Sequence, residues 1–308
     1  MNKQAYLKYI SSLLLFGSNG IVASYIFLSS YEIVFARTLI ASLFLIFIFI
    51  LSKGKFHAWK NKKHFLYIII SGIAMGASWM FLYEAYQQIG VSFATLAYYC
   101  GPVIVIALSP FVFRERLTAP KILGLFVVLT GMLLVNGKDL LQGVFSWGLL
   151  CGVMSALMLA IMIIANKKAV SITGLENSIY QLVTSFIAVA FFTLIKQGMT
   201  FSIGPESIFP ILLLGIVNTG IGCYLYFSSI QQLPSQSVAI IGYLEPLSAL
   251  IFSALFLHER LTIVQSVGAI LILSGTIFGE FYYKNRTIPI RNRTKARRLL
   301  LPPPRRRR

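Results

Sequence analysis

Charged residues are scarce in this sequence of 308 residues, and their scarcity argues against an ordinary water-soluble domain. Asp, Glu, Lys and Arg make up 12% of the chain, about half the share that soluble proteins carry. Hydrophobic residues make up 57%, and the mean hydropathy is +0.79. This composition indicates a chain whose solvent is largely a lipid bilayer.

Cysteine and histidine are also rare, which argues against disulfide scaffolds, metal sites and most hydrolytic enzymes. The three cysteines lie in apolar runs without CxxC spacing, and they are interpreted as reduced core residues. The three histidines lie in loops or at the ends of predicted helices. The sequence contains no HExxH, GxSxG or phosphate-binding glycine motif. We therefore expect no enzymatic activity, no cofactor and no resident metal.

Long apolar segments are what the sequence has in abundance. A helix needs about 20 apolar residues to cross the hydrocarbon core of a bilayer, and runs of roughly this length occur ten times. The predicted crossings are residues 5–28, 31–52, 64–86, 91–113, 120–136, 145–164, 174–195, 209–229, 234–257 and 262–283. The sequence therefore predicts an all-α polytopic membrane protein with ten transmembrane helices.

Basic residues are distributed unequally between the connections of these helices. If the N-terminus is cytoplasmic, the basic residues on the outer side are Lys138, Lys196 and Arg260. Those on the inner side are Lys3, Lys8, Lys53, Lys55, Lys60, Lys62, Lys63, Arg114, Arg116, Lys121, Lys167 and Lys168. Because positively charged connections stay in the cytoplasm, we predict a multi-pass protein of the cell (inner) membrane with both termini cytoplasmic.

A strongly basic tail follows the last predicted crossing. From Lys284 onward the chain carries eleven Lys or Arg and no acidic residue. We assign residues 285–308 to a basic, disordered tail. Its function has two open interpretations: attraction to anionic lipid on the cytoplasmic leaflet, or none, as a non-native extension. We predict no nucleic-acid partner.

The tetrapeptide Glu-Arg-Leu-Thr occurs twice, 144 residues apart, in a chain with little charge. A shift of 144 also aligns, without a gap, Gly76 with Gly220, Gln87-Gln88 with Gln231-Gln232, Tyr99 with Tyr243, Pro102 with Pro246, Gly124 with Gly268 and Gly131 with Gly275. These matches indicate an internal duplication, with repeats at residues 1–137 and 138–284. Each repeat has five crossings, an odd number, so the second enters the membrane inverted. Two inverted five-helix repeats are typical of transporters that work by alternating access.

The repeated motifs resemble those of a known family. Pro102 followed by Glu115, and Pro246 followed by Glu259, resemble the signature of the EamA-type, ten-helix branch of the drug/metabolite transporter superfamily. Arg37 is similar to an arginine that this family often places on its second helix. The resemblance covers nearly all of the chain before the basic tail. It implies export or exchange of small metabolites such as amino acids, and it does not specify the solute.

Ionisable residues inside the predicted helices are the first candidates for a substrate or coupling site, because charge is costly in lipid. Glu245 lies deepest, where its carboxyl group could take a proton or hold a substrate ammonium group. Arg37 and Glu84 are predicted at similar depths. Two interpretations remain open for them: a structural ion pair, or an Arg37 that holds a substrate carboxylate while Glu84 orients it.

Aromatic and amide side chains within the helices complete the predicted cavity. Such groups suit an amphipathic organic solute through stacking, hydroxyl contacts and cation–π attraction. The candidates are Trp79, Tyr83, Tyr99, Tyr243, Asn19 and Asn218. Trp and Tyr are also enriched at membrane interfaces, so a location at the interface is the alternative for the aromatic candidates.

Prolines and the repeated glutamates are candidates for moving parts. Pro102 and Pro246 free a backbone carbonyl within predicted helices, which predicts either a hinge in a cavity-lining helix or a static kink. Glu115 and Glu259 belong either to simple helix–turn–helix connectors or to gate latches that are ion-paired in only one state.

Small residues at helical spacing predict close helix packing. Gly124 and Gly131, with their repeat mates Gly268 and Gly275, are spaced by two turns. They are interpreted as packing contacts within the chain, and the alternative is a contact in a homodimer.

Together these patterns predict a secondary transporter that moves a small organic metabolite across the bilayer. The favoured solutes are amino acids or related amphipathic metabolites, moving outward. The alternative transport function is proton-coupled export of cationic drugs or polyamines, with Glu245 as the counter-charge. A membrane receptor or scaffold is the alternative outside transport.

Overall fold

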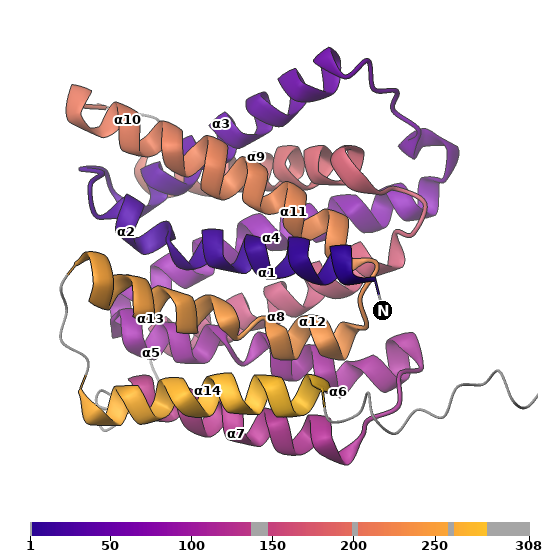
Figure 1. Ribbon diagram of the computed structural model, residues 1–308. Coiled ribbons are helices and arrows are strands. Elements are labelled where there is room, and N and C mark those ends of the chain that lie inside the picture. The colour runs from indigo at the N-terminus through magenta and orange to yellow at the C-terminus, as the bar shows by residue number, and fades with distance from the viewer. Residues whose placement is uncertain (1, 137–146, 199–202, 258–261, 282–308) are drawn as a thin grey trace, which may run out of the picture.

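The computed structural model describes residues 2–136, 147–198, 203–257 and 262–281, and over these ranges it contains helices and turns but no strand (Figure 1). The predicted all-α class is therefore confirmed. The gate candidate Glu259 and the tail 285–308 lie outside the described residues.

The helices follow one another in the predicted order. The first half contains α1 (Lys3–Gly17), α2 (Asn19–Ala23), α3 (Ser30–Leu51), η1 (Ala58–Lys60), α4 (Lys62–Ile89), α5 (Val91–Tyr98), α6 (Gly101–Phe113) and α7 (Ala119–Asn136). The second half contains α8 (Trp147–Lys168), α9 (Gly174–Gln197), α10 (Pro205–Leu213), η3 (Leu214–Ile221), α11 (Gly222–Ile230), α12 (Ser235–Ile241), α13 (Leu244–Phe256) and α14 (Ile263–Phe281).

Most of these helices are suited to a membrane. Within the described residues, eight helical segments are long and apolar enough to span a bilayer. They are Ser30–Leu51, Lys62–Ile89, Ala94–Phe113, Trp147–Lys168, Gly174–Lys196, Pro205–Ile230, Ser235–Phe256 and Ile263–Glu280. The shorter α7 and the α1–α2 pair occupy the remaining two predicted positions. The count of ten crossings stays a prediction.

Three of the predicted crossings are interrupted rather than continuous. α1 and α2 are separated at Ser18, α5 and α6 at Tyr99 and Cys100, and α12 and α13 at Gly242 and Tyr243. The second and third breaks are equivalent under the shift of 144. Each of these three predicted crossings is therefore an interrupted helix, and the segments Ala94–Phe113 and Ser235–Phe256 are still long and apolar enough to span a bilayer.

The prolines explain where the helices restart. Pro102 stands at the beginning of α6 and Pro246 in the first turn of α13. A proline is tolerated in a first turn because the N–H group that it lacks has no partner within the helix there. The two prolines therefore begin new helices after the breaks instead of kinking continuous ones.

The first helices of the two halves run in opposite directions, as inverted repeats require. At the start of α1, the Asn2 side chain hydrogen-bonds to Gln232, just after α11. At the end of α8, the Lys167 ammonium donates to the carbonyl oxygen of Ile230 at 2.8 Å. α1 therefore begins on the side of the bundle where α8 ends. We name this side, at the right in Figure 1, the N-terminal side.

A glycine seam joins α7 to α14, and it consists of Gly124, Gly131, Gly268 and Gly275. A Cβ atom on Gly124 would lie 2.7 Å from the Gly275 carbonyl oxygen, and one on Gly131 would lie 2.6 Å from the Gly268 carbonyl oxygen. The shift of 144 converts the first of these contacts into the second, so the seam is symmetric about a two-fold axis. The four glycines therefore pack inside the chain, and a homodimer contact through other faces of α7 and α14 stays a prediction.

Polar contacts join α4 to α8 and α9. The Ser78 and Ser155 hydroxyls each donate to the other residue's carbonyl oxygen, at 2.9 and 2.7 Å. The Gln181 amide donates to the Ser71 hydroxyl at 2.6 Å. All four side chains are buried. Interhelical hydrogen bonds of this kind substitute for the hydrophobic effect in lipid, and they fix the helix that carries Trp79.

Candidate functional site

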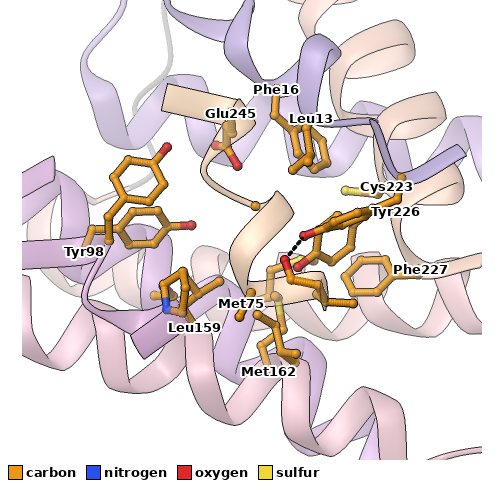
Figure 2. Close-up of a pocket in the computed structure, with 18 of the residues that line it drawn as sticks. Leu13, Phe16, Met75, Tyr98, Leu159, Met162, Cys223, Tyr226, Phe227 and Glu245 are labelled. Atoms are coloured by element: carbon orange, nitrogen blue, oxygen red, sulfur yellow. Dashed lines mark hydrogen bonds between the residues drawn. The ribbon is translucent and has the colours of Figure 1, made fainter. Parts of the chain in front are cut away.

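A cavity of about 80 Å³ lies in the middle of the bundle (Figure 2). Its wall combines apolar side chains with a few polar groups. They come from α1, α2, α4, α5, α6, α8, α11, α12 and α13 and from the chain breaks after α5 and α12. The aromatic and polar members include Tyr9, Phe16, Asn19, Ser78, Trp79, Tyr98, Tyr99, Tyr226, Phe227 and Glu245. Concave sites with apolar walls and few polar groups are typical of small-molecule binding.

Glu245 supplies the carboxylate of the cavity wall. It stands in the first turn of α13, directly after the break in the helix, and Figure 2 shows its carboxylate directed toward the cavity. The Tyr99 side chain belongs to the same cavity wall. The first turn of a helix favours negative charge. The break at Gly242 and Tyr243 therefore places an acidic group where it can meet a cationic solute or a proton.

Asn19 brings a second oxygen acceptor to the cavity from α2. Its side chain lines the cavity wall, and its Oδ1 atom is buried without a hydrogen-bond partner among the described residues. A buried acceptor without a partner costs free energy. A bound N–H donor would remove that cost.

Asn218 has a different position from the one predicted. It lies on η3 and donates its amide hydrogens to the Leu15 carbonyl oxygen at 2.9 Å and to the Ser18 hydroxyl at 2.8 Å. Ser18 marks the break between α1 and α2. Asn218 therefore supports the broken first helix from behind and is not among the residues that line the cavity.

Arg37 is a buried cation beside the cavity. Its side chain is 5% exposed, and its guanidinium group lies 4.2 Å from the centroid of the Trp79 ring. Its Nε atom has no hydrogen-bond partner among the described residues. Trp79 also lines the cavity. The stacked pair brings positive charge close to the cavity wall.

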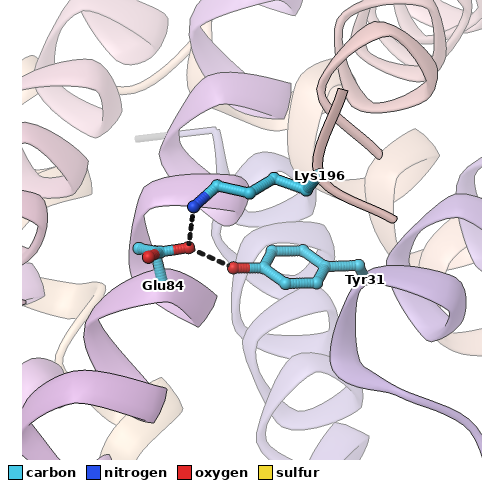
Figure 3. Close-up of polar contacts among 3 residues, drawn as sticks. All are labelled: Tyr31, Glu84 and Lys196. Carbon is cyan, nitrogen blue, oxygen red and sulfur yellow. Dashed lines mark hydrogen bonds and ion pairs between the residues drawn. The ribbon is translucent and has the colours of Figure 1, made fainter. Parts of the chain in front are cut away.

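Glu84 pairs with groups other than Arg37. Its carboxylate accepts a hydrogen bond from the Tyr31 hydroxyl and forms an ion pair with the Lys196 ammonium at 3.1 Å (Figure 3). The interpretation of Arg37 and Glu84 as a structural pair was therefore wrong. Their similar depths are compatible with contact, but the sequence could not show that Lys196 on α9 reaches Glu84 first.

Replacing Lys196 with methionine is expected to lower the free energy of unfolding by about 1 kcal/mol. The Lys196 side chain is 41% exposed, so solvent screens the pair, and such pairs are worth little. Glu84 keeps its bond from Tyr31. The measurement is denaturant unfolding in detergent, with Lys60→Met, an exposed lysine on η1, as the control. A double variant with Glu84→Gln should lose less than the sum of the single losses; strict additivity would exclude the pair.

The remaining aromatic candidates divide between the cavity wall and the layer behind it. Trp79 and Tyr99 line the cavity. Tyr243 is fully buried and donates its hydroxyl to the Tyr99 carbonyl oxygen at 2.8 Å, which fixes the break that Tyr99 occupies. Tyr83 packs edge-on against Tyr86, with ring centroids 5.4 Å apart, and is not among the lining residues.

Several lining residues were missed in the sequence, among them three on α1. Tyr9 on α1 is 1% exposed, and its hydroxyl donates to the Val238 carbonyl oxygen on α12 at 2.7 Å. Tyr9, Leu13 and Phe16 all line the cavity. They fall at positions i, i+4 and i+7, one face of a helix, and this spacing was the signal that could have found them.

Glu115 caps a helix of the other half of the chain. Its carboxylate accepts hydrogen bonds from the Ser235 backbone N–H at 2.7 Å, the Ser235 hydroxyl at 2.5 Å and the Gln236 backbone N–H at 3.1 Å. These groups begin α12. In this conformation the partners of Glu115 are neutral donors and not a cation, so the alternative of a gate latch that is ion-paired in only one state stays a prediction.

Comparisons with known proteins find similar sequences and a similar fold. The model of the EamA-like transporter family matches residues 3–137 and 146–279. The uncharacterized transporter YxxF of Bacillus subtilis (strain 168) is 27% identical over 88% of each chain. The uncharacterized inner membrane transporter YicL of Salmonella typhimurium (strain LT2) is 27% identical over 89% of this chain and 94% of its own.

Two further comparisons bear on function and fold separately. A probable amino-acid metabolite efflux pump of Escherichia coli (strain K12) is 26% identical over 61% of this chain and 67% of its own. A solved crystal structure has a TM-score of 0.76 at 16% identity, and the match covers 90% of this chain and 98% of that one. At this identity the second likeness concerns the fold alone.

Proposed function

This chain belongs to the EamA-like transporter family of membrane proteins, and we propose that it is a secondary transporter of amine-bearing organic metabolites. The observation that carries the proposal is the cavity at three helix breaks, with the Glu245 carboxylate and the partnerless Asn19 oxygen in its wall. Binding sites at broken helices near the middle of the membrane are typical of secondary transporters.

Amino acids and related amphipathic metabolites are the solutes that suit this wall best. Glu245 and Asn19 are acceptors for an ammonium group, and the Tyr and Trp rings suit an apolar side chain. Arg37, behind Trp79, supplies the positive charge that a carboxylate prefers. The similarity to the probable amino-acid metabolite efflux pump of Escherichia coli supports the same class of solute and outward transport. The proposed orientation keeps both termini in the cytoplasm.

The size of the cavity supports a transport cycle with a closed conformation. Its volume is about 80 Å³, whereas sites for drug-sized ligands measure roughly 300–1,000 Å³. A solute larger than a few water molecules therefore needs the wall to move apart. Alternating access supplies this movement, since each opening of one side enlarges the space around the central site.

Proton-coupled export of cationic drugs or polyamines is the second candidate function. It is favoured by Glu245, the one acidic residue that lines the cavity among the described residues. A carboxylate that alternates between a proton and an organic cation would couple the two fluxes. An organic cation has no carboxylate for Arg37 to attract, whereas the carboxylate of an amino acid would be attracted by Arg37.

Counterflow in proteoliposomes tests the proposal. Vesicles with the purified protein are preloaded with unlabelled solute, and the uptake of labelled amino acids and organic cations is followed with and without a pH gradient. Saturable counterflow of amino acids that weakens in Arg37→Gln supports the proposed function. Gradient-driven flux of cations that persists in Arg37→Gln supports the second candidate. Uptake no faster than in protein-free vesicles for every solute would leave a receptor or scaffold.

A further inference from the structure

The connection between α11 and α12 is held from two directions on the N-terminal side of the bundle. Glu115, after α6, binds the first residues of α12. Lys167, at the end of α8, binds the carbonyl groups that close α11. We name Glu115, Lys167 and the connection Ile230–Gln236 that they hold the clasp.

The acidic member of the clasp joins the two halves of the chain. In addition to the three hydrogen bonds of Glu115, the Gln236 amide of α12 donates to the buried Ser109 hydroxyl of α6 at 2.8 Å. α6 and Glu115 belong to the first half, and α12 belongs to the second. The start of α12 is therefore fastened to a helix that is not its neighbour in sequence.

The basic member of the clasp is a buried lysine. Lys167 is 9% exposed, and its ammonium donates to the carbonyl oxygens of Ile230, at 2.8 Å, and Leu233. It also lies 5.7 Å from the centroid of the Phe113 ring. A cation at the C-terminus of α11 and an anion at the N-terminus of α12 each complement the helix dipole that they face.

The helix behind the clasp fills the space between the cavity and the N-terminal side. α12 has seven residues, and all of them are buried. It begins at the clasp, and its residues Val238 and Ala239 line the cavity. Tyr9 holds it from α1 through the Val238 carbonyl oxygen. A path from the cavity to the N-terminal side therefore requires α12 to move, and its movement breaks the bonds of the clasp.

The clasp is not fully repeated on the opposite side. The shift of 144 places Val91 and Ser92 at the positions of Ser235 and Gln236, and it places Ala23 at the position of Lys167. The lysine thus has no counterpart in the first half. The two ends of the inverted repeats therefore differ in sequence at these positions.

We propose that the clasp is the gate on the N-terminal side, closed in this structure, and that Lys167 biases the transporter toward this closed conformation. The inference rests on the proposed transport function, because only alternating access requires this side to open. Loss of the Lys167 ammonium removes the two hydrogen bonds that hold the end of α11 and the connection that leads into α12. The open conformation then becomes more populated without any change to the cavity wall.

Accessibility of Cys223 tests the gate without any substrate. This buried thiol lines the cavity, and in a Cys100→Ser, Cys151→Ser background it is the remaining site for a membrane-impermeant maleimide. Labelling is followed in inverted membrane vesicles, which expose the cytoplasmic face, and in intact cells. In Lys167→Met we expect at least about tenfold faster labelling in inverted vesicles, since about 1.4 kcal/mol shifts an equilibrium tenfold.

The neighbouring lysine provides a matched control. Lys168 is exposed, so Lys168→Met should label at the rate of the background protein. A folded Lys167→Met variant that labels no faster than Lys168→Met would overturn the proposal. If Lys167→Met does not fold, Glu115→Ala takes its place with the same two outcomes. Failure of both variants to fold also overturns it, because a gate opens in a folded protein.

The readout separates the gate from the proposed function. Faster labelling in intact cells instead of inverted vesicles would contradict the gate and its cytoplasmic location together. Absent counterflow with the expected labelling would remove the proposed solutes and keep the gate. Normal counterflow with unchanged labelling of Lys167→Met would keep the proposed solutes and remove the gate.

Discussion

Transport of amine-bearing solutes is expected to fall by about 10- to 100-fold when Glu245 is replaced with glutamine. Glutamine has nearly the same shape, so the wall of the cavity persists, but it offers no negative charge to an ammonium group. A hydrogen bond to a charged group contributes about 1.5–3 kcal/mol, and each 1.4 kcal/mol corresponds to a factor of ten. The initial rate of counterflow in proteoliposomes measures the effect.

A control glutamate shows whether the loss of transport is specific to Glu245, and a pH gradient shows whether Glu245 also carries the proton. Glu206, in the first turn of α10, is exposed, and Glu206→Gln should transport at the wild-type rate. If Glu245 also carries the proton, Glu245→Gln should lose the response to a pH gradient in addition to its rate. A Glu245→Gln protein that transports within about twofold of wild type would remove Glu245 from the site.

Leucine at Gly131 is expected to prevent stable folding, with a loss of more than about 3 kcal/mol. The new Cβ would lie 2.6 Å from the Gly268 carbonyl oxygen and 2.9 Å from the Ile272 backbone nitrogen. Both obstacles are backbone atoms of α14, which cannot rotate aside as a side chain can. Overpacking of a dense interior already costs about 1–3 kcal/mol when side chains can adjust. The yield of monodisperse protein and its unfolding temperature in detergent measure the loss.

Gly20 offers the same substitution without the clash. A Cβ atom there meets nothing within 4 Å, so Gly20→Leu should retain the wild-type yield and unfolding temperature. The control separates the steric effect from the general effect of leucine in a helix. Equal stability of Gly131→Leu and Gly20→Leu would show that α7 and α14 do not meet at the seam.

Features with a strong local signal could be predicted from the sequence. Apolar runs placed the helices, because the length of a run is set by the thickness of the bilayer. The shift of 144 identified Tyr99 and Tyr243 as equivalent positions of a duplication, and the structure adds that the Tyr243 hydroxyl donates to the Tyr99 carbonyl oxygen. Glu245 was identified from its depth, and the structure places it in the cavity wall. Each of these predictions depends on position along the chain alone.

Features that depend on contacts between distant helices could not be predicted. The break between α12 and α13 lies within a predicted crossing, and its local signals, Gly242 and Pro246, are equally compatible with a kink in a continuous helix. The partner of Glu84 is Lys196, on a helix that sequence depth alone does not place beside it. Glu115 accepts bonds from backbone N–H groups, and such donors are invisible in a list of residue types.

The glycine seam also has a consequence for biosynthesis. Gly131 and its partner Gly268 are separated by almost half of the chain, so a ribosome that adds about 5–20 residues per second needs roughly 7–27 s between them. During this interval α7 has entered the bilayer while its helical partner has not been made. Lipid must cover the bare backbone of its glycine face until α14 arrives, so completion of the bundle waits for the last helix to be synthesised.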